Sequence, residues 1–327
     1  TVVDTATHWS GFGHFVILIL IQLGGLGIVA FATLLGLLIS GRISLRDRMN
    51  TLSEAKIVGA DNVSKLLGRI LLVYFGFELI LAAYLSIRLR FSYGEEVLHS
   101  IWYGTFHSIS AFNNGGFSLY TDSMMGFSQD MFFIAPVMLA VIVGGLGFPV
   151  LIELHERLWR LRVQPGGKPK RFSLHTRLTL WMTISLIGLG ALFIGLLEWN
   201  NPGTLGGLNT WDKLVNTVFS AVMPRSGGFN SIDISLMDPA TWLGIDLLMF
   251  IGGGSASTAG GIKVTTIAVL IFIVYTEIRG ETAVNVGNRR LPRSIQRQAL
   301  TLVALSTTAI LGTTLLFAAT TDFSLDE

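Results

Sequence analysis

The fold of this chain is decided by residues 97–117, which read VLHSIWYGTFHSISAFNNGGF. The apolar part, Val97–Phe112, is too short to cross a bilayer, because a spanning helix needs about 20 mainly apolar residues. Its length instead predicts a half-helix that enters the membrane and turns back. The glycine pair that follows, Gly115 and Gly116, suits an extended strand, because glycine adopts backbone angles that other residues avoid.

The same pattern occurs again further along the chain. Leu214–Met223 is a second short apolar stretch, and Gly227-Gly228-Phe229 lies over Gly115-Gly116-Phe117 at an offset of 112 residues. An acidic residue and a long apolar run follow each copy. The sequence therefore contains an internal repeat of the form span, half-helix, glycine strand, span.

The composition places this repeat in a membrane. Of the 327 residues, 51% are hydrophobic and 13% are charged, and the mean hydropathy is +0.61. A typical soluble domain carries about 25% charged residues, so a disordered chain, a nucleic-acid-binding arm and an ordinary soluble enzyme are excluded. Six apolar runs are expected to span the bilayer, and only the fifth is expected to be broken inside. They are His14–Ile39, Leu67–Leu89, Met131–Ile152, Leu178–Leu197, Trp242–Tyr275 and Ala299–Ala319.

Basic residues distinguish the two sides of the membrane. Three connecting segments hold 18 of the 23 Lys and Arg residues. Because basic loops stay on the cytoplasmic side, loops 40–66, 157–177 and 279–297 are expected to be cytoplasmic. The half-helices then enter from the outer side. A net charge of +2 is too small to argue for a nucleic-acid partner.

The repeat predicts the fold class and the domain organisation. We expect an all-α membrane protein with pseudo-fourfold repeats of outer helix, re-entrant pore loop and inner helix around one central ion pore. The chain is expected to be truncated at both ends. Its parts would be residues 1–66 as the end of repeat 1, 67–165 as repeat 2, 166–290 as repeat 3, and 291–327 as the start of repeat 4.

Irregular backbone at membrane depth indicates pore chemistry, because it is tolerated only inside protein or beside a water-filled cavity. Re-entrant strands can turn carbonyl oxygens toward the axis, where they replace the hydration shell of an ion. A Gly-Gly-Phe in an outer loop also fits a simple turn, but two copies after half-length helices favour a filter. The Gly- and Ser-rich segment Gly252–Thr265 predicts an unwound loop that acts as a gate, with close helix packing as the alternative reading.

Two other functions compete with gated ion conduction. A secondary cation-coupled transporter with a broken-helix site at the midplane would also use a span broken at 252–265. An intramembrane hydrolase could use Ser255, but all six histidines lie at or before His175. Without an evident base, activation of that serine has little support, and the chain is therefore predicted not to be an enzyme.

Four motifs together resemble the Ktr/Trk/HKT superfamily of K⁺ transporters, and within it the Ktr-type membrane subunit. The motifs are Ser110-Ala111-Phe112-Asn113-Asn114-Gly115-Gly116-Phe117-Ser118, Met223-Pro224-Arg225-Ser226-Gly227-Gly228-Phe229-Asn230, the run from Phe250 to Lys263, and Ile21-Gln22-Leu23-Gly24-Gly25-Leu26-Gly27. The resemblance implies K⁺ uptake across the plasma membrane of a prokaryote through filters of reduced stringency. It also implies a homodimer in the lipid bilayer and a cytosolic nucleotide-binding regulatory ring of the RCK/KTN type. K⁺ is then the transported ion, Na⁺ is a second candidate, and ATP or ADP acts only through the regulatory partner.

The candidate site has two parts. The filter residues, whose backbone carbonyls are expected to bind K⁺, are Asn113, Asn114, Gly115, Gly116, Arg225, Ser226, Gly227 and Gly228. The gate-loop residues are Gly252, Gly253, Gly254, Ser255, Ala256, Ser257, Thr258, Ala259, Gly260, Gly261 and Lys263.

Four of these residues carry particular expectations. The Arg225 side chain is expected to point behind the filter and bond to backbone or to a carboxylate. Lys263 is expected either to pair with a carboxylate or to form a positive barrier near the pore. Gly115 and Gly227 stand where the family often has Ala, so they are expected to loosen the filter strands.

Overall fold

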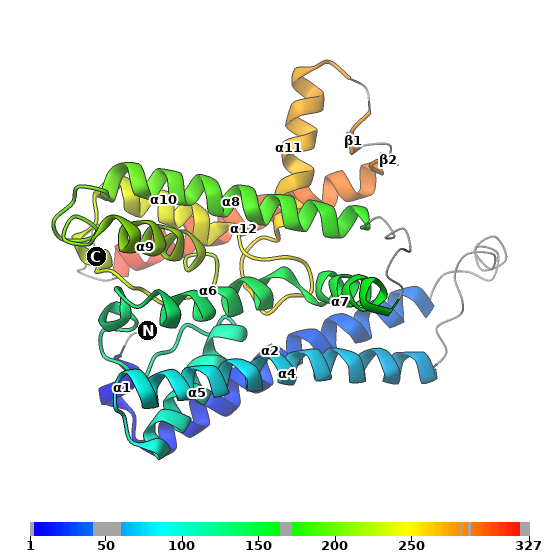
Figure 1. The fold of residues 1–327 in the computed structure, drawn as a ribbon. Coiled ribbons are helices and arrows are strands. Elements are labelled where there is room, and N and C mark those ends of the chain that lie inside the picture. Colours follow the sequence, from blue (N-terminus) through cyan, green and yellow to red (C-terminus); the bar gives the residue numbers. More distant parts are fainter. Residues whose placement is uncertain (1–2, 42–59, 164–171, 282, 287–288, 321–327) are drawn as a thin grey trace.

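The chain folds into a bundle of long and short helices (Figure 1). The computed structural model describes residues 3–41, 60–163, 172–281, 283–286 and 289–320. The α-helices are α1 (Thr5–His8), α2 (Gly11–Gly41), α4 (Ala60–Ser92), α5 (Val97–Phe112), α6 (Met131–Leu146), α7 (Phe148–Val163), α8 (Leu174–Glu198), α9 (Thr210–Val222), α10 (Pro239–Phe250), α11 (Val264–Ile278) and α12 (Arg293–Thr320). Two short 3₁₀ turns, η1 (Met125–Phe127) and η2 (Ile234–Leu236), and one antiparallel hairpin, β1 (Asn285–Val286) with β2 (Arg289–Arg290), complete the described elements. The all-helical prediction is confirmed.

Several helices are long and apolar enough to cross a bilayer. They are Ile70–Ser92 within α4, Leu174–Glu198, which is α8, and Arg293–Thr320, which is α12. The bent pair α6 and α7 passes the same test together. The break predicted inside Trp242–Tyr275 is also present, because α10 ends at Phe250 and α11 begins at Val264.

The expectation of one continuous span over Met131–Ile152 is wrong. Helix α6 ends at Leu146, α7 begins at Phe148, and the two helices meet at an angle of 107°. Gly147 between them has a φ of +91°, a conformation that glycine adopts at little cost. Pro149 in the first turn of α7 has no N–H to continue the α6 ladder. The Gly147-Phe148-Pro149 sequence was therefore a signal for this break.

The two half-helices form where the sequence predicts them. Helix α5 occupies Val97–Phe112, and α9 occupies Thr210–Val222 with its first turn capped by the Asn209 side chain, which accepts the backbone N–H of Asp212. A single buried core contains Phe112 at the end of α5 and Phe219 on α9. This shared core brings the ends of the two half-helices close to one another.

The two ends of the bundle differ in their connections. In Figure 1, α5 and α9 lie toward the end where α1 is found, and Gly41 of α2, Ala60 of α4 and Val163 of α7 lie at the opposite end. Helix α11 projects away from the bundle and leads to the β1–β2 hairpin. Much of the predicted cytoplasmic loops 40–66 and 157–177 lies outside the described residues, including the basic positions Arg42, Arg46, Arg48, Lys56, Lys168, Lys170 and Arg171.

Candidate functional site

The two glycine strands meet at Gly116 and Gly228. Both residues have positive φ, +70° and +74°. A Cβ atom added to either glycine would lie 2.8 Å from the Cα of the other. The two strands, 112 residues apart in the sequence, therefore touch at corresponding positions.

The two strands also share one backbone pattern. Asn114 and Ser226, two residues before each contact glycine, have φ values of 54° and 86°. The residues between, Gly115 and Gly227, are not among those with positive φ. Alternation of left-handed and right-handed residues turns successive carbonyls toward the same side of a strand. A carbonyl-lined ion filter needs this arrangement.

Short hydrogen bonds hold each strand against the end of its half-helix. The Gly115 N–H donates to the Ser110 carbonyl at 2.7 Å, and the Gly227 N–H donates to the Met223 carbonyl at 2.8 Å. A left-handed residue other than glycine costs on the order of 1–2 kcal/mol, so these contacts stabilise the unusual geometry at Ser226 and at its counterpart Asn114.

The expectation that Gly115 and Gly227 loosen the strands does not hold for the packing. A Cβ on Gly227 would lie 2.7 Å from Met223 Sδ and 2.8 Å from Val141 Cγ1. A Cβ on Gly115 would lie 3.3 Å from Ile21 Cγ2. Neighbouring side chains thus fill the space that an alanine methyl group would take.

A buried polar network lies behind the first strand. The Asn113 amide donates to Glu78 Oε1 and to the Ile109 carbonyl, both at 2.9 Å, and its Oδ1 accepts the Tyr74 hydroxyl. Gln22 donates to Glu78 Oε2 at 3.0 Å. Sequence reasoning identified Asn113 but missed its partners. The available signal was Glu78, an acid inside an otherwise apolar run.

Arg225 occupies the position that corresponds to Asn113 in the second strand. Its Nη2 donates to the Gly252 carbonyl at 3.2 Å, and the residue is only 7% exposed. This backbone bond confirms the expected contact of the side chain. Arg225 therefore joins the second strand to the beginning of the loop between α10 and α11.

That loop packs against the break between α6 and α7. The Gly254 N–H donates to the Gly145 carbonyl at 2.7 Å, and the Ala256 carbonyl accepts the Phe148 N–H at 3.1 Å. Because the ends of helices leave backbone groups without partners, the loop satisfies groups that the break in the neighbouring repeat exposes.

The loop also contacts both filter strands. The Thr258 hydroxyl donates to the Phe112 carbonyl at 3.2 Å, and the Gly260 N–H donates to Ser226 Oγ at 2.9 Å. Lys263 donates to the Ala259 carbonyl at 2.6 Å. This contact lies within the loop and involves no carboxylate. The sequence-predicted filter and gate residues are therefore brought together in one place.

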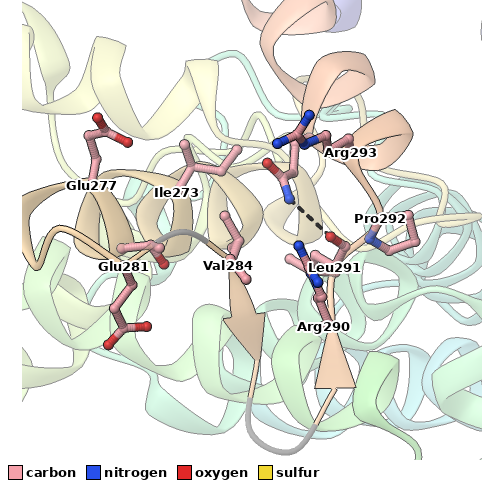
Figure 2. A pocket seen from close by; sticks show the side chains of 11 residues that line it. Ile273, Glu277, Glu281, Val284, Arg290, Leu291, Pro292 and Arg293 are labelled. Atoms are coloured by element: carbon pink, nitrogen blue, oxygen red, sulfur yellow. Dashed lines mark hydrogen bonds between the residues drawn. The ribbon is translucent and has the colours of Figure 1, made fainter.

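A second hollow lies on the hairpin beyond α11. A cavity of about 500 Å³ is lined by residues of α11, the hairpin and α12. Figure 2 shows acidic side chains, Glu277 and Glu281, on one side of this cavity and basic side chains, Arg290 and Arg293, on the other. Its mixed charge and its distance from the filter separate it from the ion site.

Comparisons with known proteins agree with this arrangement. A family model described as TrkH, cation transport protein, matches residues 1–325. The chain is 41% identical over 302 residues to "Ktr system potassium uptake protein B" of Bacillus subtilis (strain 168), covering 91% of this chain and 65% of that protein. It is 35% identical to "Ktr system potassium uptake protein D" of the same strain, covering 100% of this chain and 71% of that protein.

A solved structure is similar in fold. The potassium transporter TrkH from Vibrio parahaemolyticus superposes with a TM-score of 0.70 at 15% identity, over 98% of this chain and 63% of that one. The chain thus spans about two thirds of the length of the relatives that it matches. With a family match over nearly every residue, and with a helical membrane fold that follows a solved member, the chain belongs to the TrkH family of cation transport proteins.

Proposed function

We propose that this protein takes up K⁺ across the plasma membrane of a prokaryote through a channel-like pore. The contact between Gly116 and Gly228, with the same alternation of φ in both strands, carries the proposal. Two relatives are named as potassium uptake proteins, and that description supports K⁺ as the transported ion.

The filter would act through main-chain oxygens. Helices α5 and α9 both end at their glycine strands, and the C-terminal end of a helix carries a partial negative charge that favours a cation. Carbonyls of residues 113–116 and 225–228 would replace the hydration shell of the ion. Two equivalent strands from repeats 1 and 4 would complete a pseudo-fourfold ring, with repeat 2 at residues 67–165 and repeat 3 at residues 166–290.

The loop between α10 and α11 would act as the gate. It contacts Phe112 at the end of α5 and Ser226 in the second strand, so a displacement of the loop changes the space next to the filter. Each backbone bond that holds the loop contributes about 1 kcal/mol. A regulator therefore has to supply only a few kcal/mol to open it.

The hairpin cavity is the described surface that we assign to a cytosolic partner. Residues 279–297 form part of the predicted cytoplasmic side, and Arg290 and Arg293 face Glu277 and Glu281 across the cavity. A nucleotide-binding regulatory ring that docks there would pull on α11 and, through α11, on the gate loop. ATP or ADP would then act on transport without touching this chain. Association as a homodimer, and Na⁺ as a second ion, belong to the same proposal.

Uptake by the full-length protein tests the function. Cells that lack other K⁺ uptake should gain saturable Rb⁺ or K⁺ uptake that follows the membrane potential at every Na⁺ concentration. A strict requirement for a second ion moving down its own gradient would instead favour a secondary cation-coupled transporter, which the broken α10–α11 span also fits. Absence of uptake by protein that reaches the membrane would refute both.

A further inference from the structure

Glu78 is a buried acid with no basic partner. It is 5% exposed and lies in the span Ile70–Ser92 of α4. Within the described ranges no ion pair joins it to Lys or Arg. Acids inside a membrane are costly and almost always face a partner charge or a functional pathway. Glu78 therefore calls for a positive charge that the described side chains do not supply.

The hydrogen bonds around Glu78 suit a carboxylate. The Ile109 carbonyl can only accept, so it fixes the Asn113 amide with its NH₂ group toward Glu78 Oε1. Gln22 donates to the other oxygen, Oε2. Both carboxylate oxygens thus accept from neutral amides, which stabilise a charge without cancelling it.

The second complete repeat lacks this arrangement. At the same offset of 112 residues, Gly190 stands in the place of Glu78 and Arg225 stands in the place of Asn113. A Cβ on Gly190 would already lie 2.9 Å from Leu248 Cδ1. An acid therefore stands behind the first strand, and a cation stands behind the second.

We propose that Glu78 sets the affinity of the filter for its cation, as a fixed negative charge that positions Asn113, the first residue of the strand. This inference rests on the proposed function. Because Glu78 bonds directly to Asn113, its charge lies one side chain away from the expected carbonyl ligands. The transported ion supplies the missing positive partner each time it occupies the filter.

The charge should change affinity by a measurable factor. A unit charge about 10 Å from the ion, at an effective dielectric of about 20, changes binding roughly tenfold. Glu78→Gln removes the charge and keeps the shape. Gln22 Oε1 is buried without a partner, so a flipped Gln22 amide can accept the new NH₂ group. We expect the apparent KM for Rb⁺ uptake to rise about tenfold with little change in maximal rate.

A charge exchange separates the charge from the packing. In the double variant Gln22→Glu with Glu78→Gln, the acid moves across one hydrogen bond. The amide introduced at position 78 still accepts from Asn113 while it donates to the new carboxylate at position 22. We expect KM within about threefold of wild type, and the same for Glu78→Asp. If KM in Glu78→Gln equals the wild-type value, or if the exchanged pair is as impaired as Glu78→Gln, the proposal is wrong.

Two further measurements keep the result decisive. Glu198→Gln is the matched control, because Glu198 is a fully buried acid on α8 that bonds to Thr204 and Thr241 and touches no filter residue. It should lower thermal stability and leave KM unchanged. If Glu78→Gln fails to reach the membrane, a tenfold rise of KM in both charge-retaining variants overturns the proposal. Failure of wild-type uptake would refute the proposed function, whereas these ratios test Glu78 alone.

Discussion

Substitution of Gly228 by serine tests the filter most directly. Gly228 has a φ of +74°, and its neighbour across the contact is backbone, the Cα of Gly116. Serine at this position keeps a small polar residue but adds a Cβ atom. That atom would lie 2.8 Å from the Gly116 Cα, and a backbone atom has no rotamer by which to move aside.

The magnitude follows from two costs. A left-handed serine costs about 1–2 kcal/mol relative to glycine. Ordinary contact begins at 3.4 Å, so the strands must also separate by about 0.6 Å, because the added Cβ would lie 2.8 Å from the facing Cα. A filter discriminates between ions through the placement of its carbonyls. We expect the preference for K⁺ over Na⁺ to fall about tenfold, which corresponds to about 1.4 kcal/mol.

Competition between ions provides the assay. Rb⁺ uptake by the full-length protein is measured over a range of Na⁺ concentrations, and the inhibition constant for Na⁺ is divided by the KM for Rb⁺. Gly94→Ser is the matched control, because Gly94 has a φ of +70° and open space around its added Cβ. It carries the same backbone strain outside the filter. Unchanged selectivity in Gly228→Ser, with normal amounts in the membrane, would refute the filter assignment.

Three further outcomes follow from the same contacts. Thr258→Val removes the 3.2 Å hydroxyl bond to the Phe112 carbonyl, worth about 1 kcal/mol, and should raise basal K⁺ flux in reconstituted vesicles about fivefold; a flux equal to wild type argues against a gate at this loop. Shortening Gly252–Ala259 should raise the flux further, and a correctly folded deletion with wild-type flux contradicts the same idea. Asp130→Asn weakens the two bonds from Arg88, at 2.9 and 3.1 Å. Because this pair is partly exposed, thermal unfolding should show a loss of about 1 kcal/mol with selectivity intact.

Local patterns determined what the sequence could predict. The bounds of α5, Val97–Phe112, follow from the length of an apolar run and the glycines after it. The contact between Gly116 and Gly228 follows from the repeat, since equivalent strands around one axis must meet. The break in the fifth run follows from the density of Gly and Ser between Gly252 and Gly261.

Tertiary partners determined what the sequence could not predict. The bend at Gly147 persists because the Phe148 N–H finds the Ala256 carbonyl, a residue that lies more than 100 positions away. The bond between Glu78 and Asn113 depends on how α4 and α5 cross. Gly227 is tight rather than loose because Val141 of the preceding repeat fills the space beside it.

The bonds between the gate loop and the α6–α7 break are made mostly by main-chain atoms. They therefore depend on the number of residues between α10 and α11 more than on which small residues those are. One added or deleted residue shifts the following donors by about 3.3–3.6 Å, whereas the bonds themselves measure 2.7 Å at Gly254 and 3.1 Å at Phe148. Related proteins should accordingly vary in side chains along this loop and keep its length, and a loop of altered length would mark a member that closes its pore in another way.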